Sequence, residues 1–183
     1  MKQLVGWKPA LAVGFALAVL AGTSSSEPVA FDKVPEAVAN TFRSAFPNGT
    51  IAKLDVEEEN GVMVYDFEFT AGDREKECDI AGDGTMIEST LVVAAKDIPA
   101  PALKTIKKVA GKATLGRLEW LETFYELEAG KLMKLEKSEI HYAAEMHRGG
   151  QMAEVFVDPA GKITEKPKWA PETPAKAPTS GSH

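Results

Sequence analysis

The sequence has few of the residues that most often carry catalysis or bind metals. Cys78 is the only cysteine, and the histidines are His141, His147 and His183. The chain contains no H-E-x-x-H, C-x-x-C or G-x-S-x-G motif, no phosphate-cradling glycine loop and no dinucleotide fingerprint. We therefore expect a protein that is not an enzyme, with no catalytic residue, no metal site and no cofactor.

The single cysteine and the internal histidines also exclude particular sites. An exported chain with one cysteine has no internal disulfide, so its core must supply the stability. Cys78 is expected to be a buried, unreactive thiol, and pairing of Cys78 between two chains is left open. On one strand, His141 and His147 would share a face but lie about 20 Å apart, too far for one metal ion.

The chain has fewer basic than acidic residues. Lys and Arg number 21 against 27 Asp and Glu, which gives a net charge of −6. Lys2 and Lys8 are the only charges before Glu27, so removal of that segment changes −6 to −8. An acidic chain of this kind is a poor partner for nucleic acid or an anionic membrane surface.

Both ends of the chain differ from its middle. Residues 1–26 combine lysines, an apolar run and small polar residues, as in a signal peptide, and the run is too short to span a membrane. We expect cleavage between Gly22 and Ser26, export to the periplasm or the medium, and no membrane span in the mature form. Residues 166–183 are rich in Pro, Ala and Lys and are expected to form a disordered tail.

Two stretches of the middle resemble each other, residues 65–88 and 142–165. Aligned without gaps, they share Tyr65 with Tyr142, Glu68 with Glu145, Gly72 with Gly149, Glu77 with Glu154, Gly84 with Gly161, and Glu88 with Glu165. Alternation predicts strands, with Tyr65, Phe67 and Phe69 on one face and Asp66 and Glu68 pointing to water. Asn60-Gly61 predicts a hairpin turn, and further glycines predict turns at 72–73, 82–84, 149–150 and 159–161.

Each of these stretches follows a predicted helix. Residues 34–46 place Val34, Val38, Phe42 and Phe46 on one helical stripe, and residues 98–111 repeat the pattern. Both segments open with an apolar residue followed by Pro, which a first helical turn tolerates. We therefore expect an α+β fold of two tandem repeats, each a helix packed on an antiparallel β-sheet.

In the order of these features the chain resembles the PepSY-like domains of exported bacterial proteins. These domains are related in fold to the beta-lactamase inhibitor protein and to the propeptide module of thermolysin-type metallopeptidases. The features are the prolines at 35 and 99, the Asn-Gly hairpin, the tyrosines with alternating acids, and the glycine turn before the last strand. The resemblance predicts one repeat at 31–92 and a second at 95–165, with an insertion of 13 residues within 116–141.

What the resemblance implies is a non-catalytic module that binds another protein in the cell envelope. We expect a peptidase inhibitor or an envelope regulator whose partner is an envelope or secreted peptidase or another protein. The alternative is a periplasmic binder of a small ligand or cation that uses the acidic surface of the sheets.

One aromatic cluster is a candidate partner-binding surface. It lies in the insertion and comprises Trp120, Phe124 and Tyr125. As a strand, residues 118–128 would expose apolar side chains on both faces, and aromatic side chains of that kind anchor interfaces. As a helix, the same residues could all pack in the core. The pattern leaves the two possibilities open.

Overall fold

The computed structural model describes residues 27–172. The expected signal peptide, residues 1–26, and residues 173–183 of the expected tail lie outside the described residues. The helices are α1 (Glu36–Ala45) and α2 (Ala100–Ala110), with short 3₁₀ turns η1 (Phe31–Lys33) and η2 (Ala95–Asp97) before them. The strands are β1 (Glu27–Pro28), β2 (Gly49–Glu59), β3 (Val62–Ala71), β4 (Arg74–Ala81), β5 (Met86–Val92), β6 (Thr114–Glu128), β7 (Lys131–Arg148), β8 (Gln151–Val157), β9 (Ile163–Glu165) and β10 (Ala170–Pro171).

All ten strands belong to one antiparallel sheet, in the order β1-β2-β3-β4-β5-β6-β7-β8-β10, and β9 also pairs with β8. The expected fold of two tandem repeats, each a helix packed on an antiparallel β-sheet, is therefore wrong. β5 pairs with β6 over five residues, from Glu88 opposite Thr123 to Val92 opposite Glu119. Two separate sheets would each leave an unpaired edge strand here, and this pairing satisfies the backbone groups of both.

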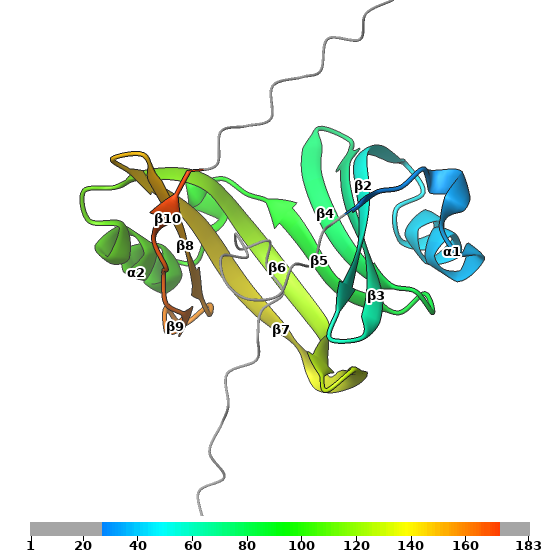
Figure 1. Ribbon diagram of the computed structural model, residues 1–183. Helices are drawn as coiled ribbons and strands as arrows, with labels where there is room; N and C mark the ends of the chain where they lie inside the picture. The colour runs from blue at the N-terminus through cyan, green and yellow to red at the C-terminus, as the bar shows by residue number, and fades with distance from the viewer. Residues whose placement is uncertain (1–26, 173–183) are drawn as a thin grey trace, which may run out of the picture.

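Both helices cover the same face of the sheet. One row of directly paired residues crosses four strands: Cys78, Ser89, Glu122 and Ile140. Cys78 packs in the α1 core, while Tyr142, two residues beyond Ile140 on β7, packs in the α2 core. Since residues two apart on a strand share a face, α1 and α2 lie on one side, at opposite ends of the sheet (Figure 1). We call the opposite side the helix-free face.

The α1 core is built from aromatic rings. Phe42 of α1 stacks on Phe67 of β3 with ring centroids 4.5 Å apart, and it meets Phe69 edge-on at 5.0 Å. Phe67 and Phe69 are both buried on the α1 side of β3, as the sequence predicted for this face. Cys78 is also buried there, and burial raises the pKa of its thiol, as expected of an unreactive cysteine.

Small residues let α2 approach its strands closely. Ala102 of α2 and Ala144 of β7 are both fully buried, with Ile106 and Val155 filling the space beside them. The turn after β8 is fixed to α2, because the Thr105 hydroxyl donates a 2.7 Å hydrogen bond to the carbonyl of Gly161. Thr41 of α1 holds Gly84 in the same manner at 2.7 Å.

The stretch expected to contain the insertion lies in the long hairpin β6–β7, whose turn is at Ala129-Gly130. A Cβ on Gly130 would lie 3.1 Å from the carbonyl oxygen of Asn60, so this turn touches the predicted Asn60-Gly61 turn between β2 and β3. Leu127 beside it packs against Val64, Ala81 and Ile87. The extra length of this hairpin therefore ties β6 and β7 to the first four strands.

Part of the expected tail is ordered. Ala170–Pro171 forms β10 on β8, and the Arg148 guanidinium lies 3.8 Å from the centre of the Trp169 ring. For residues 166–172 the prediction of disorder is therefore wrong, because composition alone did not reveal that Trp169 has an apolar surface to cover. Within residues 27–172, neither helix has the length and apolar character needed to cross a membrane.

Candidate functional site

The helix-free face carries a line of acidic side chains that runs across the strands. Direct pairing places one residue from each of β2, β3, β4 and β5 side by side: Asp55, Asp66, Asp79 and Glu88. We call these four residues the acidic row. The next residue in line is Thr123 of β6, whose hydroxyl donates a 2.7 Å hydrogen bond to Glu88. Directly opposite members of the row repel each other when both carboxyl groups are ionised.

The acidic row is largely withdrawn from water. Asp55 and Asp66 are each 4% exposed, and Glu88 is 3% exposed. The expectation that Asp66 would point to water is therefore wrong, and Glu68, which was expected to do the same, is only partly exposed. Alternation placed Asp66 on the correct side of β3, but it did not reveal that neighbouring strands and the β6–β7 hairpin would enclose that side.

Burial and neighbouring negative charges raise the pKa of three members of the row, Asp66, Asp79 and Glu88. Burial raises the pKa of Asp66 to about 7, and the charges of Glu77 and Glu68 act in the same direction. Burial also raises the pKa of Glu88 to about 7, although the hydrogen bond from Thr123 opposes the shift. The pKa of Asp79 lies well above its ordinary value for the same reason. The row is therefore partly protonated near pH 7.

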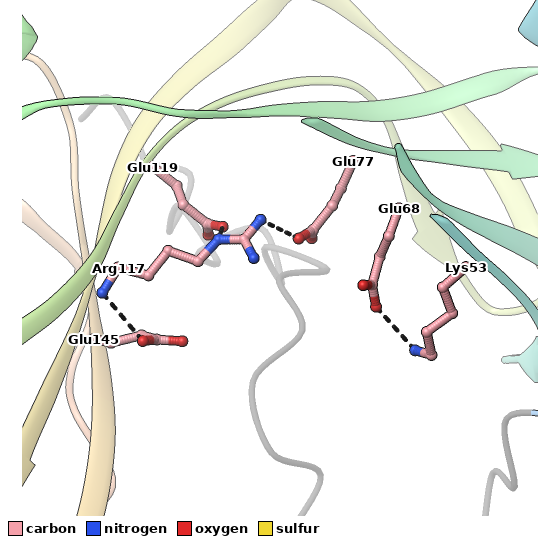
Figure 2. A network of polar contacts seen from close by, with 6 residues as sticks. All are labelled: Lys53, Glu68, Glu77, Arg117, Glu119 and Glu145. Atoms are coloured by element: carbon pink, nitrogen blue, oxygen red, sulfur yellow. Dashed lines mark hydrogen bonds and ion pairs between the residues drawn. The ribbon is translucent and has the colours of Figure 1, made fainter. Parts of the chain in front are cut away.

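A second group of polar residues lies beside the row and includes two cations (Figure 2). Lys53 of β2 contacts Asp55 at 2.8 Å and Glu68 at 2.9 Å. Arg117 of β6 pairs with Glu77 of β4 and with Glu119 of its own strand. Because Arg117 reaches Glu77 across the intervening β5, the side chains of these strands converge over the helix-free face.

Glu145 of β7 completes this network. Its carboxylate accepts a 3.1 Å hydrogen bond from the backbone N–H of Arg117, at an irregularity in the β6–β7 pairing. Burial raises the pKa of Glu119 to about 7 despite Arg117, and it raises the pKa of Glu154 on β8 to about 8. The helix-free face therefore holds more acid than its two cations neutralise.

A hollow of about 280 Å³ opens between these groups. Its polar lining includes Glu68, Thr70, Glu75, Glu77 and Arg117. The hollow lies where β3, β4 and the start of β6 face one another, on the side of the sheet that no helix covers. It is large enough to admit a side chain of a partner.

His141 and His147 are in different surroundings, and neither is in a group that could hold a metal ion within residues 27–172. His141 is buried, its Nδ1 has no hydrogen-bond partner within residues 27–172, and burial lowers its pKa. Nδ1 of His147 lies 2.8 Å from a carboxylate oxygen of Glu172, and the hydrogen bond that it donates there raises the pKa of His147. Within the described part of the chain, no group of three or more His, Cys, Asp or Glu residues is placed to hold a metal ion.

The aromatic candidates lie on a strand, which decides between the two conformations that the sequence left open. Trp120 is on β6 and packs partly against the α2 core, opposite Tyr142 of β7. Phe124 and Tyr125 lie further along β6, at an irregularity of the pairing, and both are partly exposed. The three side chains are close in sequence, but Trp120 already contributes to the core.

The acidic row has a signal in the sequence. Three of its members lie between apolar residues and the fourth follows one: Leu54 and Val56 around Asp55, Tyr65 and Phe67 around Asp66, Cys78 and Ile80 around Asp79, and Ile87 before Glu88. That pattern marks strands that are covered on one face and acidic on the other. The lateral alignment of the four acids depends on the register, which the pattern does not contain.

Comparison with known proteins identifies the fold. No protein-family model and no curated protein matches the sequence. Solved structures do match. A BLIP-like protein from Bacteroides fragilis NCTC 9343 has 14% identity and a TM-score of 0.55, and the match covers 78% of this chain and 91% of that chain. This chain has a BLIP-like fold.

Two further matches are of the same kind. A protein from Bacteroides eggerthii DSM 20697 that is described as periplasmic has 10% identity and a TM-score of 0.56, with 74% of this chain and 88% of that chain covered. A DUF2874 family protein from Bacteroides uniformis ATCC 8492 has 11% identity and a TM-score of 0.55, with 74% and 89% covered. These likenesses support neither the PepSY resemblance nor two tandem copies.

Proposed function

We propose that this protein is an exported, non-catalytic module that binds another protein in the cell envelope through its helix-free face. The proposal rests on the difference between the two faces of the sheet. One face is covered by α1 and α2, while the other holds a hollow of about 280 Å³ and a converging set of charged side chains. A large sheet surface of this kind, left without a helix, is a surface for a partner.

The structural neighbours support the same proposal. One is described as periplasmic and another as BLIP-like. An enzyme of the envelope, such as a peptidase, is therefore the partner class that we propose, with the protein acting as its inhibitor or regulator. Trp120, Phe124 and Tyr125 form a second candidate contact, because Phe124 and Tyr125 are partly exposed.

The alternative is a binder of a small ligand, which the hollow favours. A molecule that filled it would meet the carboxylates of Glu68, Glu75 and Glu77 and the cations of Lys76 and Arg117. Such a lining suits a small molecule that carries groups of both charges. Calorimetric titration with low-molecular-weight envelope extract tests this alternative, and heat that disappears in the Glu77→Gln variant would support it.

Photo-crosslinking tests the protein-binding proposal. A photoreactive amino acid at Thr70, which is exposed at the rim of the hollow, should give adducts with a defined envelope protein. The matched control is the same amino acid at Lys108, which is exposed on α2. Adducts that form equally at both positions, or at neither, would contradict the proposal.

The same experiment separates the two candidate contacts. A variant with Trp120→Ala, Phe124→Ala and Tyr125→Ala, shown by circular dichroism to be folded, should keep the Thr70 adducts if the helix-free face is the contact. If the adducts vanish in the folded variant, the aromatic side chains carry the binding.

A further inference from the structure

The last described residues, 166–172, lie along β8, and we call this segment the strap. Its backbone attachment is short. β10 is two residues long, and the N–H of Glu172 adds a 2.9 Å hydrogen bond to the carbonyl of Gly150. Pro167 and Pro171 have no N–H to donate, so the strand pairing cannot be extended through them. Side-chain contacts must therefore help to hold the strap in place.

Two side-chain contacts join the strap to the end of β7. The guanidinium of Arg148 lies 3.8 Å from the centre of the Trp169 ring, and Trp169 packs against the α2 core. Nδ1 of His147 donates a 2.8 Å hydrogen bond to the carboxylate of Glu172. Arginine stays charged at every pH at which proteins are folded, whereas histidine changes its charge near neutrality. Of these two contacts, the one between His147 and Glu172 therefore responds to pH.

The surroundings of His147 fit the protonated ring. Its Nδ1 contacts Glu172, and its Nε2 lies 3.6 Å from the carboxylate of Glu145. The ring lies against β6 at Gly116, where an added Cβ would be 2.5 Å from Nε2. Only a protonated imidazole carries an N–H on both nitrogens, so a neutral ring presents a lone pair to one of the two carboxylates. The neutral ring is therefore the weaker link between the strap and the sheet.

Other charged groups lie on the elements around this contact: Glu145 and Arg148 of β7, Arg117 of β6, Glu154 of β8 and Lys168 of the strap. When ionised, the carboxylates favour the protonated ring, and the cations oppose it. The hydrogen bond that Glu172 accepts has the largest effect, and it raises the pKa of His147. Release of the strap removes this bond, so the pKa of His147 differs between the docked and the released strap.

From this geometry we infer that the strap is a pH-controlled cover, docked on β8 while His147 is protonated and released when His147 becomes neutral. Release uncovers the edge of β8 at Gln151 and Met152, with which β10 pairs, and the part of the α2 core that Trp169 covers. An uncovered strand edge presents unpaired backbone groups, to which another extended segment can add. This device is independent of the proposed function, because it acts at the edge of the sheet and not at the hollow of the helix-free face.

The direction of the pH dependence follows from the contact with Glu172. In the docked state its carboxylate holds the pKa of His147 above the usual value of 6.5, and in the released state that carboxylate is gone. The docked state therefore binds more protons between the two pKa values. The stability that this contact gives to the docked strap is complete below the pKa of the released histidine, and it is lost as the pH rises through the raised pKa.

Nuclear magnetic resonance of the full chain tests the inference. The imidazole signals of His147 are assigned with His147→Gln, and the indole N–H signal of Trp169 is assigned with Trp169→Phe. Between about pH 5.5 and about pH 8.5, we expect the Trp169 signal to move from its docked to its released position, with the same midpoint as the titration of His147. That midpoint should lie above 6.5, the usual value for histidine.

Two variants separate this contact from general charge effects. His147→Gln cannot be protonated, so it should abolish the pH dependence of the Trp169 signal. Glu172→Gln removes the carboxylate, so it should lower the midpoint of His147 and shift the Trp169 signal toward its released position at the acidic end of the titration. The matched control is Asp73→Asn in the exposed turn between β3 and β4, which should leave both midpoints unchanged. Circular dichroism across the titration verifies that each variant is folded.

Three results would overturn the inference. They are a Trp169 signal that does not move with pH, a movement that persists in His147→Gln, and a His147 midpoint that is the same in Glu172→Gln as in the unchanged protein. None of them alters the photo-crosslinking at Thr70, so the failure of the strap and the failure of the proposed function are told apart.

Discussion

Asp66 shows how one residue links stability to the proposed site. It is 4% exposed, one of its oxygens has no hydrogen-bond partner within residues 27–172, and burial raises its pKa from 3.8 to about 7. The native state therefore binds more protons than the unfolded state between these two values. The stability contributed by the protonated carboxyl is complete below pH 3.8 and is lost as the pH rises through about 7.

We predict that Asp66→Asn stabilises the protein at pH 8 and has little effect at pH 4. An amide keeps the shape of the side chain but cannot ionise, and each pH unit between the two pKa values is worth at most about 1.4 kcal/mol. Urea unfolding at both pH values measures the free energy. Asp97→Asn, in the exposed η2 turn, serves as the control. An unchanged pH dependence in Asp66→Asn would show that Asp66 is not protonated in the fold.

At the scale of elements, the long hairpin β6–β7 decides the shape of the molecule. It pairs with β5 on one side and β8 on the other, and its turn lies against the β2–β3 turn. Leu127 near its tip is 9% exposed and packs in a small cluster with Val64, Ala81 and Ile87. This cluster is on the opposite side of β3 from Phe67 and helps to enclose the acidic row.

Leu127→Ala should lower the free energy of unfolding by about 2–3 kcal/mol, because it leaves a cavity between the hairpin and β3–β5. The control is Met133→Ala in the same hairpin, which is 50% exposed and should change stability by less than about 0.5 kcal/mol. Urea unfolding compares the two variants. Equal effects would mean that the hairpin tip does not pack on the first four strands.

The whole molecule is one sheet, so its two ends should unfold together. β5 and β6 are paired across the middle, and both sides of this pairing bury side chains. A single domain whose sheet runs unbroken from one end to the other is expected to show one cooperative transition. Two self-contained repeats would instead unfold at separate denaturant concentrations.

Two local probes test this prediction. Buried Cys78 reports the α1 end through its reaction with a thiol reagent, and Trp120 and Trp169 report the α2 end through fluorescence. Residues 27–183, the expected mature form, contain no tryptophan besides these two, and both signals should give one midpoint in urea. Midpoints that differ by more than the error of the fits would show two independent units.

Local structure could be predicted from neighbouring residues alone. Apolar stripes containing Val38 and Phe42 predicted α1, the alternation of Phe67 and Phe69 predicted β3, and Asn60-Gly61 predicted a hairpin turn. These signals depend on residues close in sequence, whose periodicity reports which side is apolar. The same periodicity placed Asp66 opposite the core, on the side where the structure has it.

Which strands are neighbours, and what surrounds the acidic side chains, depends on contacts between residues far apart in the sequence. Nothing near residue 88 in the sequence indicates that Glu88 lies opposite Thr123, because strand pairing depends on backbone groups that every residue carries. The single sheet, the enclosure of the acidic row and the approach of Arg117 to Glu77 all follow from that long-range pairing. Periodicity reports one face of one strand, and a site assembled from four strands depends on their register.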